Sequence, residues 1–132
     1  MYQIRKGWPS NGAIDEVFTA ATNATSGELE ELSEGMIVTV KDHKAAPAAS
    51  ADDSAALAFV IGHEQARKTW TGLLSQCVIE CDADHYTGTF DAGDKVTVSN
   101  GKFAKAGSGA TAIGRVLAYD APMLRVLWYE SK

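Results

Sequence analysis

The chain has 132 residues, of which 45% are hydrophobic and 22% charged, with a formal net charge of −5. This length suits one domain with a sizeable core, and the composition is that of an ordinary globular protein. The acidic balance argues against nucleic acid and against an anionic membrane as partners, because both need a concentrated basic face. No run approaches the roughly 20 apolar residues of a membrane span. Residues 1–10 lack the apolar stretch of a secretory signal, so we expect folding in a reducing cytoplasm.

Residues 1–12 are predicted to form an extended N-terminal arm. Tyr2, Ile4 and Trp8 alternate with polar residues, and Pro9 disfavours a helix. Such an arm is typical of an edge strand or a docking tail. We hypothesise that it pairs as an added strand with a partner subunit or a neighbouring protomer. The alternative is that Trp8 packs on the protein's own barrel.

Residues 13–132 are predicted to form a single β-rich domain. Short runs indicate strands at 17–21, 36–40 and 76–81, and the fully apolar run 57–61, closed by Gly62, indicates another. Residues 28–34 fit one helical turn or an acidic loop, and residues 64–74 fit a short helix or a strand. The Ala/Ser/Asp-rich segment 44–56 is predicted to be a long exposed loop.

The C-terminal third is the clearest β pattern in the chain. Strands are predicted at 95–99, 102–105, 112–119 and 123–129, and Asn100-Gly101 is a strong hairpin signal. We therefore expect a mostly β fold, a small antiparallel barrel or sandwich with at most one short helix. The predicted core consists of Val38, Val40, Phe59, Ile61, Val96, Val98, Ile113, Val116, Val126 and either Leu127 or Trp128.

An internal similarity links two parts of the chain. Gly35–Val40 resembles Gly93–Val98, and Ala58–Gly62 resembles Ala110–Gly114. These segments define a candidate pseudo-repeat of residues 35–62 and 93–114. Short β motifs also resemble each other by chance, so duplication and coincidence both remain open.

No residue pattern indicates catalysis, a metal or a cofactor. The histidines stand beside carboxylates but lack ligand spacing and a neighbouring nucleophile motif. Asp82 and Asp84 lack the glycine and glutamate of a calcium loop, and the Gly107–Gly114 segment lacks the ending of a P-loop. Two cysteines with C-x3-C spacing are expected to be small buried hydrophobes, because one strand would hold them too far apart for a disulfide. The residues concerned are His43, His63 and His85 with Asp42, Glu64 and Asp84, and Cys77 and Cys81.

The segment GDKVTVSNGKFAKAGSGATAIGRVLAY resembles the capsid decoration (cement) proteins of tailed bacteriophages. The resemblance covers about a third of the chain and consists of turn and strand residues. It implies a small β-rich structural virion protein, often a homotrimer, that binds the outside of the assembled head. Its partner would be the major capsid protein, whose neighbouring subunits it staples against internal DNA pressure. The matching residues are Gly93, Asp94, Val96, Val98, Gly101, Lys102, Phe103, Ala106, Gly107, Ile113, Gly114 and Val116.

The resemblance also implies a location: the outer capsid surface, after synthesis in the host bacterial cytoplasm. Aromatic residues on both faces of strand 123–129 favour self-association, because Trp128 and Tyr129 must face opposite sides. Candidate interface residues toward capsid or protomer are Tyr2, Ile4, Trp8 and Tyr129.

Three other functions fit the sequence less well. The chain could be another virion or tail component with the same kind of β domain, because fold does not fix function. It could be a carbohydrate-binding module that uses Trp and Tyr side chains. A small hydrolase or metal enzyme fits least, because no group of residues meets the geometric requirements of an active site.

Overall fold

The computed structural model describes residues 2–6, 15–51, 56–74 and 77–128, with the side chains of all of these except 3–6 and 15. The described residues form strands and turns and contain no helix, which confirms the predicted mostly β class. The strands are β1 (Tyr2–Lys6), β2 (Asp15–Ala20), β3 (Ile37–Lys41), β4 (Lys44–Pro47), β5 (Ala56–Glu64), β6 (Thr69–Leu73), β7 (Cys77–Cys81), β8 (Lys95–Ser99), β9 (Lys102–Lys105), β10 (Gly114–Asp120) and β11 (Met123–Trp128).

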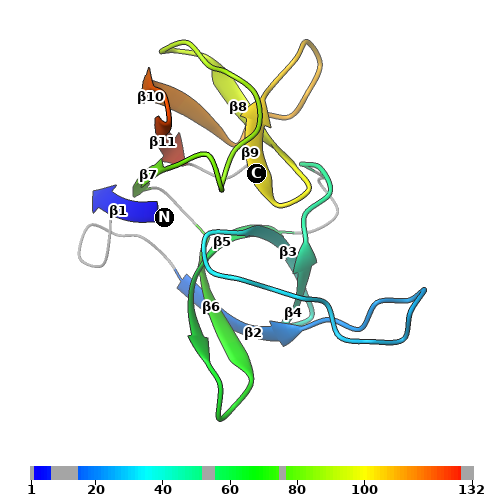
Figure 1. Cartoon of the computed structure of the whole chain (residues 1–132). Helices are drawn as coiled ribbons and strands as arrows, with labels where there is room; N and C mark the ends of the chain where they lie inside the picture. Colours follow the sequence, from blue (N-terminus) through cyan, green and yellow to red (C-terminus); the bar gives the residue numbers. More distant parts are fainter. Residues whose placement is uncertain (1, 7–14, 52–55, 75–76, 129–132) are drawn as a thin grey trace.

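The strands form two units that pack on each other (Figure 1). The first is a closed barrel in the order β2-β4-β3-β5-β6. The second is a six-stranded sheet in the order β1-β7-β11-β10-β8-β9. β1 is the edge strand of this sheet and lies antiparallel to β7. The N-terminal arm therefore contributes a strand to its own chain.

The two units repeat one strand arrangement. The order β2-β6-β5-β3-β4 of the barrel matches the order β7-β11-β10-β8-β9 of the sheet. In the barrel, β4 closes on β2 in parallel at Ala20 and Ala45. In the sheet, the segment after β7 pairs with β9, again in parallel, through a bridge between Tyr86 and Phe103. The second unit is thus a five-stranded arrangement like the first, with β1 added at its edge.

The hydrogen bonds of the two units correspond in detail. The Gly35 and Gly93 amides donate to the carbonyls of Val60 and Val116, each at 2.8 Å. Both β5 and β10 carry a bulge directly after that valine. The Gly35–Val40 and Gly93–Val98 segments hold equivalent positions, as their sequence similarity suggests. The segments Ala58–Gly62 and Ala110–Gly114 do not hold equivalent positions. Their sequence similarity aligns Val60 with Ala112, whereas the structural counterpart of Val60 is Val116.

Each unit is built around a tight hairpin whose turn residues adopt positive φ. Asn100 and Gly101 connect β8 to β9 with φ of 50° and 81°, as the Asn-Gly signal predicts. Asp42 and His43 connect β3 to β4 in the same way, with φ of 53° and 63°. Asp and His are among the non-glycine residues that enter this region most readily.

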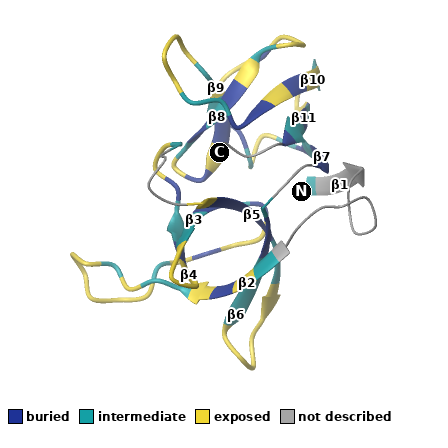
Figure 2. Cartoon of the chain, turned by 180° about the vertical axis from the view of Figure 1, so that it is seen from behind, coloured by how far each residue is buried: buried dark blue, intermediate teal, exposed yellow. Residues whose placement is uncertain are grey.

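The core spans both units (Figure 2). The larger cluster joins Ile37, Phe59 and Leu73 of the barrel to Ile79 and Trp128 of the sheet, all fully buried. A smaller cluster fills the barrel interior around Phe18 and Val38. These contacts hold the barrel and the sheet together in one structure.

Most of the predicted core is confirmed, with Trp128 rather than Leu127 turned inward. Val40 and Ile61 are corrections: both are only partly buried and lie at the margins of the two clusters. Val40 is near the hairpin turn, and Ile61 falls in the β5 bulge, where the strict alternation of faces is lost.

The predicted exposed loop 44–56 is also corrected. Its first residues form β4, and Ala45 and Ala48 are fully buried. Alanine and proline give little strand signal. Here the Asp42-His43 turn folds the segment back onto β3, and Ala45 packs in the barrel cluster with Phe18 and Val38. Residues 64–74, open between helix and strand, form a turn followed by β6.

Candidate functional site

Tyr2, the first candidate interface residue, packs against its own chain. Its ring meets Phe59 edge to face, with ring centroids 5.2 Å apart. Its hydroxyl lies 3.0 Å from the carbonyl oxygen of Ile61 and 3.1 Å from a carboxylate oxygen of Glu34. Burial and the Glu34 carboxylate raise the pKa of the phenol to about 12. Tyr2 thus anchors β1 to the barrel through its ring and its hydroxyl group.

The other candidate interface residues are described in part or not at all. Ile4 lies in β1 opposite Ile79 of β7, and its side chain is outside the described set. Trp8 and Tyr129 lie outside the described residues. Tyr2 is therefore the one candidate among the four whose side chain belongs to the described part of the chain.

The histidines take three separate structural positions. His43 is a turn residue of the first hairpin. His63 stacks on Trp70 with ring centroids 3.8 Å apart. His85 is half-buried beside Gly35 and Tyr2, and burial lowers its pKa. Among the described residues, no group of three or more His, Cys, Asp or Glu side chains is placed to hold a metal ion.

Cys77 and Cys81 are free, buried thiols on the core side of β7. Burial raises the pKa of each thiol to about 12. At neutral pH both are therefore protonated and poorly nucleophilic, because the thiolate is the reactive form. Their position agrees with the predicted role as small hydrophobes.

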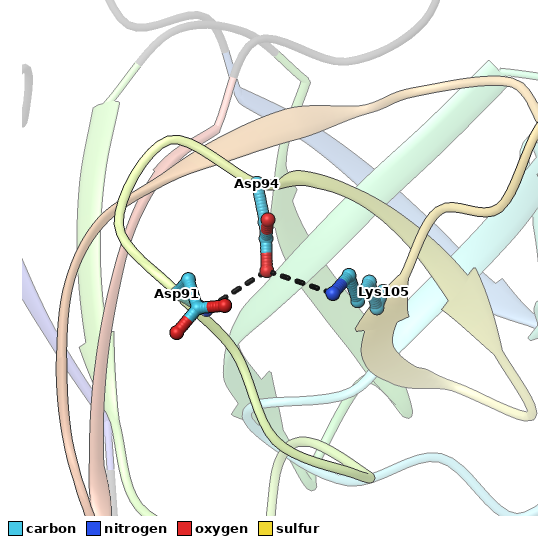
Figure 3. A network of polar contacts seen from close by, with 3 residues as sticks. All are labelled: Asp91, Asp94 and Lys105. Carbon is cyan, nitrogen blue, oxygen red and sulfur yellow. Dashed lines mark hydrogen bonds and ion pairs between the residues drawn. The ribbon is translucent and has the colours of Figure 1, made fainter.

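The residues that carry the family resemblance build the second hairpin and its entry turn. Asp94 accepts a hydrogen bond from the Asp91 amide at 2.8 Å and pairs with Lys105 at 3.4 Å (Figure 3). The amide hydrogen bond, and then the lysine, hold the pKa of Asp94 below its usual range. Val96, Val98 and Phe103 point into the core. These buried residues of the cassette therefore serve the fold.

The barrel carries a groove lined mainly by residues of β2, β4, β5 and β6. Its volume is about 470 Å³, and Leu29 beside it is 61% exposed. Lys44 and Lys68 contribute positive charge, against one carboxylate, Glu30. The lining residues are Thr19, Ala20, Thr22, Leu29, Glu30, Lys44, His63, Lys68 and Trp70.

The sequence did not predict this groove because its lining comes from three stretches that are far apart in the chain: 19–30, residue 44 and 63–70. The side chains lie on β2, β4, β5 and β6, on the loop after β2 and on the turn between β5 and β6. An isolated bridge between Thr22 and Leu29 closes that loop on itself, and the Ala21 amide at its start donates to the Ala45 carbonyl of β4. The only sequence signal was Leu29, an apolar residue within an acidic segment.

No known family model, curated protein or solved structure matches the chain. No helix among the described residues is long and apolar enough to cross a membrane.

Proposed function

We propose that the chain is a structural phage virion protein that binds the outer surface of the assembled head and bridges neighbouring major capsid subunits. The observation that carries the proposal is the resemblance of the Gly93–Val116 cassette, which forms a continuous hairpin-and-strand scaffold here. A decoration protein needs such a rigid scaffold and surfaces for docking. It works on the outer capsid surface after synthesis in the host cytoplasm.

The barrel groove is the best candidate for contact with the capsid. Leu29 offers an exposed apolar anchor, and Lys44 and Lys68 line the groove together with one carboxylate, Glu30. The groove fits an extended segment of the major capsid protein that carries an acidic residue. Copies on a repeating lattice, arranged as a trimer, convert one modest contact into high avidity.

The groove suits a peptide better than a sugar. Sugar-binding modules offer a free aromatic face, but the Trp70 ring is stacked against His63 on one side and packs on the barrel core. The stacking of Trp70 therefore favours a structural virion protein over a carbohydrate-binding module.

The test is co-sedimentation with undecorated capsids assembled from the major capsid protein of the phage that encodes this chain. We expect the purified protein to sediment with the capsids and to saturate at a fixed ratio of copies per subunit. Capsids already carrying the protein are the control and should take up none. Absence of binding to undecorated heads would contradict the proposal.

A matched pair of variants tests the groove itself. Leu29→Lys removes the apolar anchor, whereas Thr25→Lys adds the same charge at another exposed site of the same loop. We expect Leu29→Lys to weaken capsid binding at least about tenfold and Thr25→Lys to leave it unchanged. Equal binding by both variants would show that another surface contacts the capsid.

A further inference from the structure

The two units differ at one strand edge, the edge of β7 in the second unit and of β2 in the first. In the second unit, the outer edge of β7 is occupied by β1. The equivalent strand of the first unit is β2, and β4 pairs with it only at Thr19 and Ala20. Before Thr19, no other described strand lies along this edge of β2. Within the described ranges, the second unit therefore has an added strand at this edge and the first unit has none.

The open edge presents backbone groups that are ready to pair. Thr19 and Ala21 donate their amides toward β4, to His43 and Ala45. Because amides alternate in direction along a strand, the Val17 amide points to the same edge. Its acceptor among the described residues is the carboxylate of the adjacent Glu16, at 3.3 Å. The Val17 side chain is 53% exposed.

We propose that this edge of β2 pairs with the outer edge of β1 in a second copy of the chain. β1 is the terminal strand of the six-stranded sheet, so its outer edge is also without a described neighbour. Strand addition between two open edges gives affinity through main-chain hydrogen bonds. The pairing joins the sheet of one copy to the barrel of the next.

Charge favours β1 of a second copy and sets the direction of pairing. β1 ends with Arg5 and Lys6, whereas β2 begins with Asp15 and Glu16. In an antiparallel pair, the basic end of β1 comes to lie beside the acidic end of β2. A parallel pair would separate these opposite charges. β1 and β2 thus match in both edge geometry and charge.

This contact joins two different edges, so it is heterologous and forms a ring if its rotation closes. A single strand pair buries little area, so we expect weak association, with a dissociation constant of about 10 μM to 1 mM. The inference does not depend on capsid binding. A monomer that still binds capsids would overturn it and leave the proposed function intact.

The test is sedimentation equilibrium of the full chain over a concentration series, with three substitutions at Val17. Val17→Pro removes the outward amide, Val17→Lys places a charge on the edge, and Val17→Ala keeps the amide while removing most of the side chain. We expect Val17→Ala to associate, and Pro and Lys to weaken association at least about tenfold. Circular dichroism and thermal melting check that each variant is folded. If the Val17→Pro variant is unfolded, the result for Val17→Lys decides the test.

A charge exchange tests the partner strand. Lys6→Glu and Glu16→Lys should each weaken association, and the double variant should restore it, with the effect decreasing as salt rises. In the associated form, hydrogen exchange at the Val17 amide should slow. A wild-type chain that stays monomeric at about 1 mM, or a folded Val17→Lys chain that associates like wild type, would overturn the proposal.

Discussion

The imidazole of His85 occupies the space that a side chain at Gly35 would need. A Cβ atom at Gly35 would overlap the ring of His85, with Nδ1 only 2.7 Å away. Gly35 stands at the start of β3 with φ of +85°, and His85 follows β7. The ring of Tyr2 meets His85 from β1, with centroids 6.1 Å apart. This contact therefore lies where the barrel, the sheet and the N-terminal strand meet.

Replacing Gly35 with alanine should destabilise the protein by about 2–4 kcal/mol. Part of the loss comes from the left-handed backbone, and the rest from the overlap with His85. Gly88→Ala is the matched control, because Gly88 has φ of +83° with open space around it. It should cost only about 1–2 kcal/mol. Urea unfolding measures the loss of stability in both variants. Equal losses would show that the His85 ring moves away from the new methyl group without cost.

The protein should lose stability through His85 as pH falls below about 6.5. Burial lowers the pKa of His85 in the folded state, so the unfolded chain binds a proton more readily. The stabilising contribution is therefore complete above the unfolded pKa and decreases as pH falls through it toward the folded value. His85→Gln cannot titrate, so its melting temperature should depend less on pH between about 7.5 and 5. If the melting temperatures of wild type and His85→Gln change with pH to the same extent, this assignment is contradicted.

The strands that the sequence predicted well are those with strong local signals. Asn100-Gly101 favours the positive φ of its turn, and alternating residues such as Val96 and Val98 show which face is buried. β4 was missed because its position depends on the Asp42-His43 turn and on space inside the barrel. Neither is visible in a run of alanines.

The binding surfaces were predicted less well, because they depend on which strands become neighbours. Tyr2 showed the alternation of a docking strand, yet that strand pairs with β7 of the same chain. The open edge of β2 appears only when the two units are compared. Leu29 and Trp70, far apart in sequence, line one groove through tertiary contacts alone.

Val96→Asp should abolish folding. Val96 is fully buried between β10 and β9, and an unpaired carboxylate there costs several kcal/mol, comparable to the whole stability of a small domain. Lys95→Asp is the control, because Lys95 is its exposed neighbour on the same strand. Circular dichroism and solubility distinguish the two. A soluble Val96→Asp protein with a normal melting curve would show that this face of β8 is not core.

Substitutions at Tyr2 decide whether its side chain serves the fold or contacts the capsid. Tyr2→Phe keeps the ring against Phe59 and removes the hydroxyl near Ile61 and Glu34, so it should cost about 1 kcal/mol. Tyr2→Ala also removes the half-buried ring and should cost about 2–3 kcal/mol. Because both losses concern contacts within the chain, capsid co-sedimentation below the melting temperature should equal that of wild type. Deleting residues 1–8 should lower the melting temperature further, because β1 leaves the sheet. A Tyr2→Ala protein that melts normally but no longer binds capsids would place Tyr2 at the capsid interface instead.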